Sequence, residues 1–165
     1  MKLTVKLSIP IGYAFWFDDG SYRSSGVIEP TTGEQVLRDL QCRARPLWPG
    51  LKDEEITSIA IDSEVGSDLL EKLTGKHVAA LIVGLGKMTL NETVRVVNSG
   101  GWKVRAMGRY GALLALVGLP PEIDWDEGAA ILMGLDCGYG TQIEGISTKV
   151  QTIMKAAATN VEKLN

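Results

Sequence analysis

Residues 56–67 read ITSIAIDSEVGS, a short apolar run that is closed by Asp62, Ser63, Glu64 and Gly66. The run is short for a helix and rich in β-branched residues, which predicts a buried central strand of a sheet. Asp62 and Glu64 are two positions apart, so on an extended chain both side chains point to the same side. Ligands bind at the carboxyl ends of strands in open α/β sheets. Such a pair of acids either holds a divalent cation or is simply hydrated at the strand end.

Three extended segments precede this strand. Residues 3–9 alternate apolar and polar side chains, and residues 12–17 and 22–29 form two further extended runs. The sequence Asp-Asp-Gly at 18–20 predicts a hairpin turn between the last two runs. Helical spacing of apolar residues, with a threonine at the start, predicts a helix over 32–45. The chain is therefore expected to open with three antiparallel strands and a helix.

The second half of the chain mixes helical and extended patterns. Helical spacing of apolar residues predicts helices over 68–73, 89–97, 110–117, 128–135 and 147–164. Residues 77–86 are apolar nearly all round and fit either a buried helix or a strand, whereas residues 102–107 alternate and predict a strand. We expect an α/β domain over 1–146 and a C-terminal amphipathic helix over 147–165, which docks on the core or on a second subunit.

Composition limits the classes of protein. A chain of 165 residues with 45% hydrophobic and 22% charged residues fits one globular domain and excludes a mostly disordered chain. Cys42 and Cys137 have neither metal-site nor disulfide spacing, so we expect two small core residues in a reducing compartment. No secretory leader and no apolar run of about 18 residues is visible, which predicts a cytoplasmic protein without a membrane span.

The positive charge of the chain is concentrated in two groups. The net charge of −3 argues against indiscriminate nucleic-acid binding, but local basic surfaces can still bind phosphate. The first group lies on the outer face of the predicted helix over 32–45, and the second lies in and after the extended pattern at 102–107. The two groups are Arg38, Arg43 and Arg45, and Lys103, Arg105 and Arg109. They are either solvated faces or phosphate contacts.

The order of the predicted elements resembles the RNase H-like plan. Residues 11–28, IGYAFWFDDGSYRSSGVI, resemble the opening of RuvC-like Holliday-junction resolvases, in particular their short phage versions. SIAID at 58–62 looks like the strand that carries their second carboxylate, and WDEGAAILM at 125–133 is similar to their late acidic helix. The segment 122–135 also fits the helix that precedes the acidic one. The resemblance covers residues 3–135 and implies an RNase H-like mixed sheet, three antiparallel strands and then parallel strands, flanked by helices.

The same resemblance implies a metal-dependent DNA endonuclease that acts as a homodimer on branched DNA. It places Mg²⁺ or Mn²⁺ on Asp62 and Asp126, with Glu64 beside them in the catalytic group. Two of the four family carboxylates are missing, because Lys6 stands at the first-strand aspartate position and Ala129 at the second acid of the late helix. A two-metal hydrolase needs several converging carboxylates. The Lys6 ammonium is instead expected to repel cations and to pair with Asp62.

Two functions follow from these residues. The first is a nucleic-acid-binding protein that retains some nuclease chemistry at Asp62, Glu64 and Asp126 around one metal. The second is a non-catalytic interaction or assembly module that has kept the fold and lost the chemistry, and Lys6 favours it. The strand pairing that the resemblance implies, together with the alternation of both strands, predicts that Lys6 and Asp62 lie on adjacent strands with their side chains facing the same site.

Overall fold

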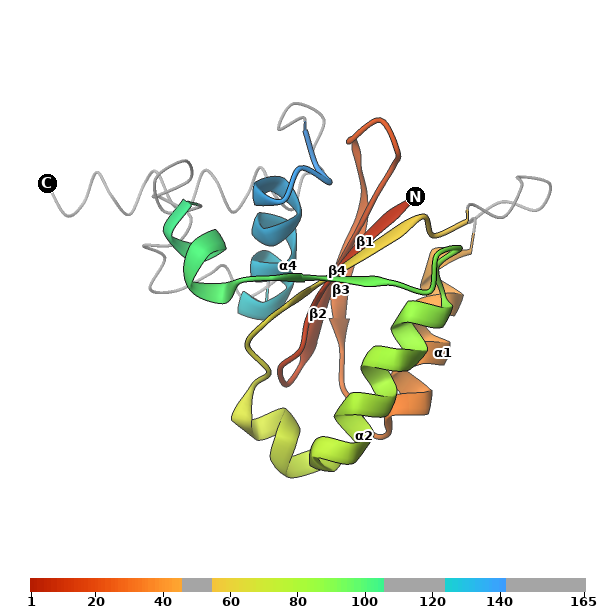
Figure 1. Ribbon diagram of the computed structural model, residues 1–165, viewed down its shortest axis with the longest axis vertical. Coiled ribbons are helices and arrows are strands. Elements are labelled where there is room, and N and C mark those ends of the chain that lie inside the picture. Colours follow the sequence, from red (N-terminus) through yellow and green to blue (C-terminus); the bar gives the residue numbers. More distant parts are fainter. Residues whose placement is uncertain (46–54, 106–123, 142–165) are drawn as a thin grey trace, which may run out of the picture.

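The computed structural model describes residues 1–45, 55–105 and 124–141. Its centre is a five-stranded sheet in the order β3-β2-β1-β4-β5, with helices on both faces (Figure 1). The strands are β1 (Lys2–Lys6), β2 (Ile11–Trp16), β3 (Tyr22–Ile28), β4 (Ser58–Asp62) and β5 (Val94–Val97). The helices with complete bounds are α1 (Gly33–Ala44), α2 (Ser67–Lys87) and α4 (Trp125–Asp136).

Strand β1 lies at the middle of the sheet and joins its two halves. It pairs antiparallel with β2, which pairs antiparallel with β3, and it pairs parallel with β4, which pairs parallel with β5. The β2–β3 connection turns at Gly20, whose φ of +87° is a backbone conformation that glycine adopts without strain. The expected mixed sheet, three antiparallel strands followed by parallel ones, is confirmed.

The alternation of β1 divides the core between the two faces of the sheet. Leu3 and Val5 pack with α1 and α2 on one face. On the other face, the Thr4 hydroxyl donates a hydrogen bond of 2.7 Å to the carbonyl oxygen of Ala130 in α4. Since side chains alternate along a strand, Lys6 shares the α4 face with Thr4.

Two helices agree with the pattern of the sequence. Helix α1 begins at the predicted place, where the side chain of Thr32 accepts a hydrogen bond from the backbone N–H of Gln35. The predicted helix over 128–135 lies within α4, which Asp124 caps in the same way. The segment 77–86, for which helix and strand were both open, is helical and belongs to α2.

Two predicted elements are wrong. Residues 89–97 are not a helix, because Val94–Val97 form β5 beside β4. The apolar residues in that segment happen to recur at helical spacing, but a β-branched run is stabilised more by pairing at the open edge of a sheet. The strand predicted over 102–107 is wrong in its described part, since 102–105 belong to a helical segment, 99–105. Asn98, which directly follows the predicted helix over 89–97, starts this helical segment, and its side chain accepts from the N–H of Gly101 at 2.8 Å.

Some expectations fall outside the described residues: the helices at 110–117 and 147–164, the domain boundary at 146, and Arg109. The expectation that both cysteines are core residues is wrong for Cys42, which is exposed on α1, while Cys137 is partly buried against α4. Cys42 lies on the outer side of an amphipathic helix whose buried positions are Val36, Leu40 and Ala44. Among the described helices, none is long and apolar enough to cross a bilayer.

Candidate functional site

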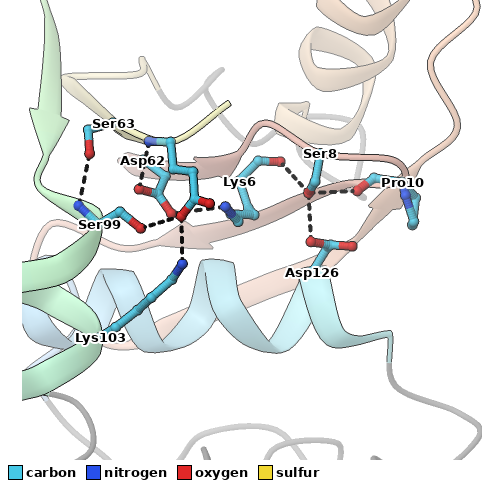
Figure 2. A network of polar contacts seen from close by, with 9 residues as sticks. Lys6, Ser8, Pro10, Asp62, Ser63, Ser99, Lys103 and Asp126 are labelled. Carbon is cyan, nitrogen blue, oxygen red and sulfur yellow. Dashed lines mark hydrogen bonds and ion pairs between the residues drawn. The ribbon is translucent and has the colours of Figure 1, made fainter. Parts of the chain in front are cut away.

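The candidate site lies at the end of the sheet where β1 and β4 finish, next to the first turn of α4 (Figure 2). Lys6 ends β1 and Asp62 ends β4, one step beyond the registered pair Val5 and Ile61. The Lys6 Nζ atom lies 3.0 Å from Asp62 Oδ2, and the two side chains are 9% and 0% exposed. The prediction that these residues face the same site from adjacent strands is confirmed.

Asp62 depends on Lys6 for its charge balance. Its Oδ1 atom accepts a hydrogen bond of 3.1 Å from the backbone N–H of Glu64. Its Oδ2 atom is within ion-pair distance of Lys6, but in the described part of the chain no group donates it a hydrogen bond of normal geometry. A buried carboxylate without an opposite charge is strongly unfavourable. The ammonium of Lys6 therefore supplies most of the stabilisation of the Asp62 carboxylate.

The Glu64 carboxylate is held by side chains of the helical segment 99–105. Its Oε2 atom accepts hydrogen bonds from Lys103 Nζ and Ser99 Oγ, both at 2.8 Å. The pKa of Glu64 is lowered to about 2, mainly by the hydrogen bond from Lys103 and next by the hydrogen bond from Ser99. Ser63 adds to this connection, because its hydroxyl accepts from the Ser99 N–H at 2.9 Å (Figure 2). Glu64 thus fastens the loop after β4 to the helical segment that follows β5.

Asp126 reaches the site from the first turn of α4. Its Oδ1 atom accepts a hydrogen bond of 2.6 Å from Ser8 Oγ, just beyond the end of β1. Burial raises the pKa of Asp126 above its usual value, although the Ser8 hydrogen bond acts in the opposite direction. Ala129, one turn further along α4, is 2% exposed in the apolar core between α4 and the sheet. The position at which the resemblance implies a second late carboxylate is therefore part of the apolar core.

These residues do not fit the divalent metal that the resemblance implies. Within residues 1–45, 55–105 and 124–141, no three His, Cys, Asp or Glu side chains gather as a metal-binding group. Asp62 pairs with Lys6, Glu64 binds Lys103 and Ser99, and Asp126 accepts from Ser8. Two-metal hydrolysis requires carboxylates that converge on the cations. The described site instead presents three carboxylates that each have a protein partner.

The structure separates the two basic groups. Helix α1, which carries Arg43 in its last turn and is followed by Arg45, covers one face of the sheet together with α2. The helical segment 99–105, which carries Lys103 and Arg105, lies beside α4 on the other face (Figure 1). They therefore do not form one continuous surface.

The basic residues also differ in their partners. Arg38 forms an ion pair of 3.1 Å with Glu34. Arg105 donates two hydrogen bonds from Nε and one from Nη2 to Asp136, whose side chain is 1% exposed. Arg43 donates to the Tyr13 hydroxyl at 2.8 Å and lies over its ring. Among the described residues, carboxylates neutralise the charges of Arg38, Lys103 and Arg105 but not those of Arg43 and Arg45.

Two polar residues of this site were not identified from the sequence. Ser8 lies two positions after Lys6, and this spacing on an extended strand was a signal that it would share the α4 face. Ser99 had no comparable signal, because it lies between the predicted helix over 89–97 and the predicted strand over 102–107. Its role depends on the helix that starts there and on the loop that carries Glu64.

Comparisons with known proteins agree with this architecture. No family model matches the chain, and no curated protein matches its sequence. Among solved structures, the chain is similar to T. thermophilus RuvC in complex with a Holliday junction substrate, with a TM-score of 0.52 and 12% sequence identity. The similarity covers 88% of this chain and 98% of that chain. At this identity the similarity concerns the fold, and the mixed five-stranded sheet flanked by helices is RNase H-like.

Proposed function

We propose that this protein binds DNA, branched DNA included, and does not cleave it by two-metal hydrolysis. The fold supports the first half of the proposal, because it is shared with a RuvC that was solved on a Holliday junction. A fold alone does not establish function, so the second half depends on the site. The ion pair of 3.0 Å between Lys6 and Asp62 is the observation that carries it.

The charge of Lys6 opposes a divalent cation at the same place. At about 4 Å and an effective dielectric constant of about 20, each unit of like charge costs about 4 kcal/mol. A cation bound by Asp62 would have to overcome this repulsion or displace the ammonium from its buried position. The proposed function therefore does not require Mg²⁺ or Mn²⁺.

Arg43 and Arg45 are the proposed phosphate contacts. Arg43 lies in the last turn of α1 and Arg45 directly follows the helix, and no carboxylate within the described ranges neutralises them. Counterions are released when phosphates bind such groups. The affinity for DNA is therefore expected to fall steeply as the salt concentration rises. Lys103 is a weaker candidate, because Glu64 already binds its ammonium.

The test is fluorescence anisotropy with a labelled four-way junction, a duplex of the same sequence and a single strand. Each is titrated at two salt concentrations, in EDTA and in MgCl₂, and the same samples are run on a denaturing gel. We expect salt-sensitive binding of equal affinity in both buffers, without cleavage. Cleavage that needs MgCl₂ and is lost in Asp62→Asn would show a nuclease and overturn the second half of the proposal.

The alternative is a non-catalytic assembly module in the cytoplasm. The Lys6–Asp62 ion pair supports this alternative equally well, because such a module would keep the fold and lack metal-dependent catalysis. Failure to bind all three DNA species at low salt would select this alternative. Self-association remains a prediction from the apolar spacing over 147–164, and light scattering of the intact chain measures it. Substitution Ile153→Glu is expected to reduce the mass of an oligomer, and Lys155→Glu, off the apolar stripe, serves as its control.

A further inference from the structure

We infer that Lys6 acts as an internal cation in place of a metal ion, and that removal of its charge makes this end of the sheet responsive to divalent cations. The inference concerns Lys6 and Asp62 within the free protein and does not rest on DNA binding. The resemblance implied a metal here, and the residues present do not fit one while Lys6 keeps its charge.

The position of Lys6 supports this inference. Its ammonium lies between the ends of β1 and β4, 3.0 Å from a carboxylate oxygen that has no hydrogen-bond donor in the described part of the chain. Asp62 is 1% exposed, so water has little access to it. This oxygen has unused capacity to accept, and the Lys6 ammonium is the cation that lies beside it.

Three acids from different elements lie close to Lys6. Its ammonium pairs with Asp62 at the end of β4, and the other oxygen of that carboxylate accepts from the backbone N–H of Glu64. Asp126, in the first turn of α4, accepts from Ser8, two residues after Lys6 (Figure 2). A cation bound in place of the ammonium would lie at the same end of the sheet as these acids.

The substitution Lys6→Met isolates the charge. Methionine is unbranched and of similar length, so it fills most of the space of the lysine stem without an ammonium. In EDTA, Asp62 would then be a buried carboxylate without an opposite charge, which is strongly destabilising. We expect the melting temperature of Lys6→Met to be lower than that of the unmodified chain by about 10 °C.

Manganese provides the decisive measurement. Addition of millimolar MnCl₂ is expected to raise the melting temperature of Lys6→Met by several degrees, because a ligand that binds only the folded state stabilises it. The unmodified chain is expected to show no change. Electron paramagnetic resonance of Mn²⁺ reports binding directly and should show a bound fraction for Lys6→Met alone.

Two further variants make the test specific. Lys87→Met removes an exposed lysine at the end of α2 and should change neither the melting temperature nor the response to MnCl₂. Lys6→Met/Asp62→Asn removes both buried charges, so it should be more stable in EDTA than Lys6→Met and should not respond to MnCl₂.

Other results would overturn the inference. An equal response of the unmodified chain and Lys6→Met to MnCl₂ would show that the Lys6 charge does not control cation binding. If Lys6→Met unfolds in EDTA, refolding from urea replaces the thermal measurement. Recovery only with MnCl₂ supports the inference, whereas failure in both buffers, together with normal folding of the double variant, contradicts it.

Discussion

The Ser8 hydroxyl donates a hydrogen bond of 2.6 Å to Asp126 Oδ1, and this contact joins residues 118 positions apart in the chain. It connects the end of β1 to the first turn of α4 beside the Lys6–Asp62 ion pair (Figure 2). Burial nevertheless raises the pKa of Asp126. The contact positions α4, but burial at this place removes part of the hydration of the Asp126 carboxylate.

The raised pKa predicts the pH dependence of Asp126→Asn. A carboxyl group whose pKa is higher in the folded state contributes stability below its unfolded pKa, and this contribution is lost as the pH rises through the folded value. At neutral pH the ionised Asp126 therefore costs stability, and an asparagine can still accept from Ser8. We expect Asp126→Asn to be more stable than the unmodified chain at pH 7, with a difference that shrinks toward pH 3. Urea unfolding at both pH values measures this.

A variant of the donor provides the control. Ser8→Ala removes the hydrogen bond that lowers the pKa of Asp126, so that pKa should rise further. An NMR titration of the carboxyl group that shows a fall instead would contradict the role of the Ser8 hydrogen bond in lowering the pKa of Asp126.

The second prediction concerns Glu64 and Lys103. The pKa of Glu64 is about 2 mainly because Lys103 donates to it, so Lys103→Met should raise that pKa toward its ordinary value. Stability from the depressed pKa is present above the unfolded value and is lost as the pH falls from about 5 to 2. Since Glu64 is largely exposed, the pair contributes at most about 1 kcal/mol. Carboxyl NMR titrations with and without high salt measure the effect, and an unchanged pKa in Lys103→Met would exclude Lys103 as its cause.

The third prediction concerns Gly12 on β2. A Cβ atom added at Gly12 would overlap the backbone carbonyl of Asp126, so Gly12→Ala must displace the start of α4. We expect a loss of about 2–3 kcal/mol in the free energy of unfolding, as for other overpacked positions. Gly75→Ala is the control, because a Cβ there meets nothing within 4 Å and Gly75 directly follows the break in α2 at Thr74, so little change in stability is expected. Urea unfolding should show the loss for Gly12→Ala alone, and equal effects would disprove the close approach of α4 to β2.

The fourth prediction concerns Arg43 in DNA binding. Arg43→Glu should weaken binding of the four-way junction about tenfold or more at low salt and reduce the slope of affinity against salt by about one unit or more. Lys87→Glu makes the same charge change on α2 and controls for the effect of net charge. Anisotropy titrations at several salt concentrations measure both. Equal losses in the two variants would indicate a general charge effect and not a contact at Arg43.

The sequence by itself determined the parts of the fold that depend on neighbours along the chain. Alternation predicted β1, extended runs on either side of the turn at Gly20 predicted β2 and β3, and Thr32 marked the start of α1, since each signal acts within a few residues. The apolar run before Asp62 predicted β4 for the same reason.

The tertiary structure alone decided which elements the ambiguous segments form. Residues 94–97 have a spacing that fits a helix, but pairing with the open edge of β4 makes them a strand. Residues 102–105 alternate like a strand, but burial of Trp102 against α4 and the cap at Asn98 make them part of a helix. Long-range burial overrode local periodicity at both places.

The residues of the candidate site also divide into those that the sequence indicated and those that only the tertiary structure brought together. The sequence supplied Lys6, Asp62 and Asp126 as candidates, and the resemblance placed the first two on adjacent strands. Only the folded chain brought Ser8 to Asp126 and Ser99 to Glu64, because these contacts join segments far apart in the sequence. Only the folded chain separated Arg43 from Lys103, because the sheet lies between the helices that carry them. Local sequence specifies the elements, whereas the electrostatics of the site depends on which distant side chains are buried together.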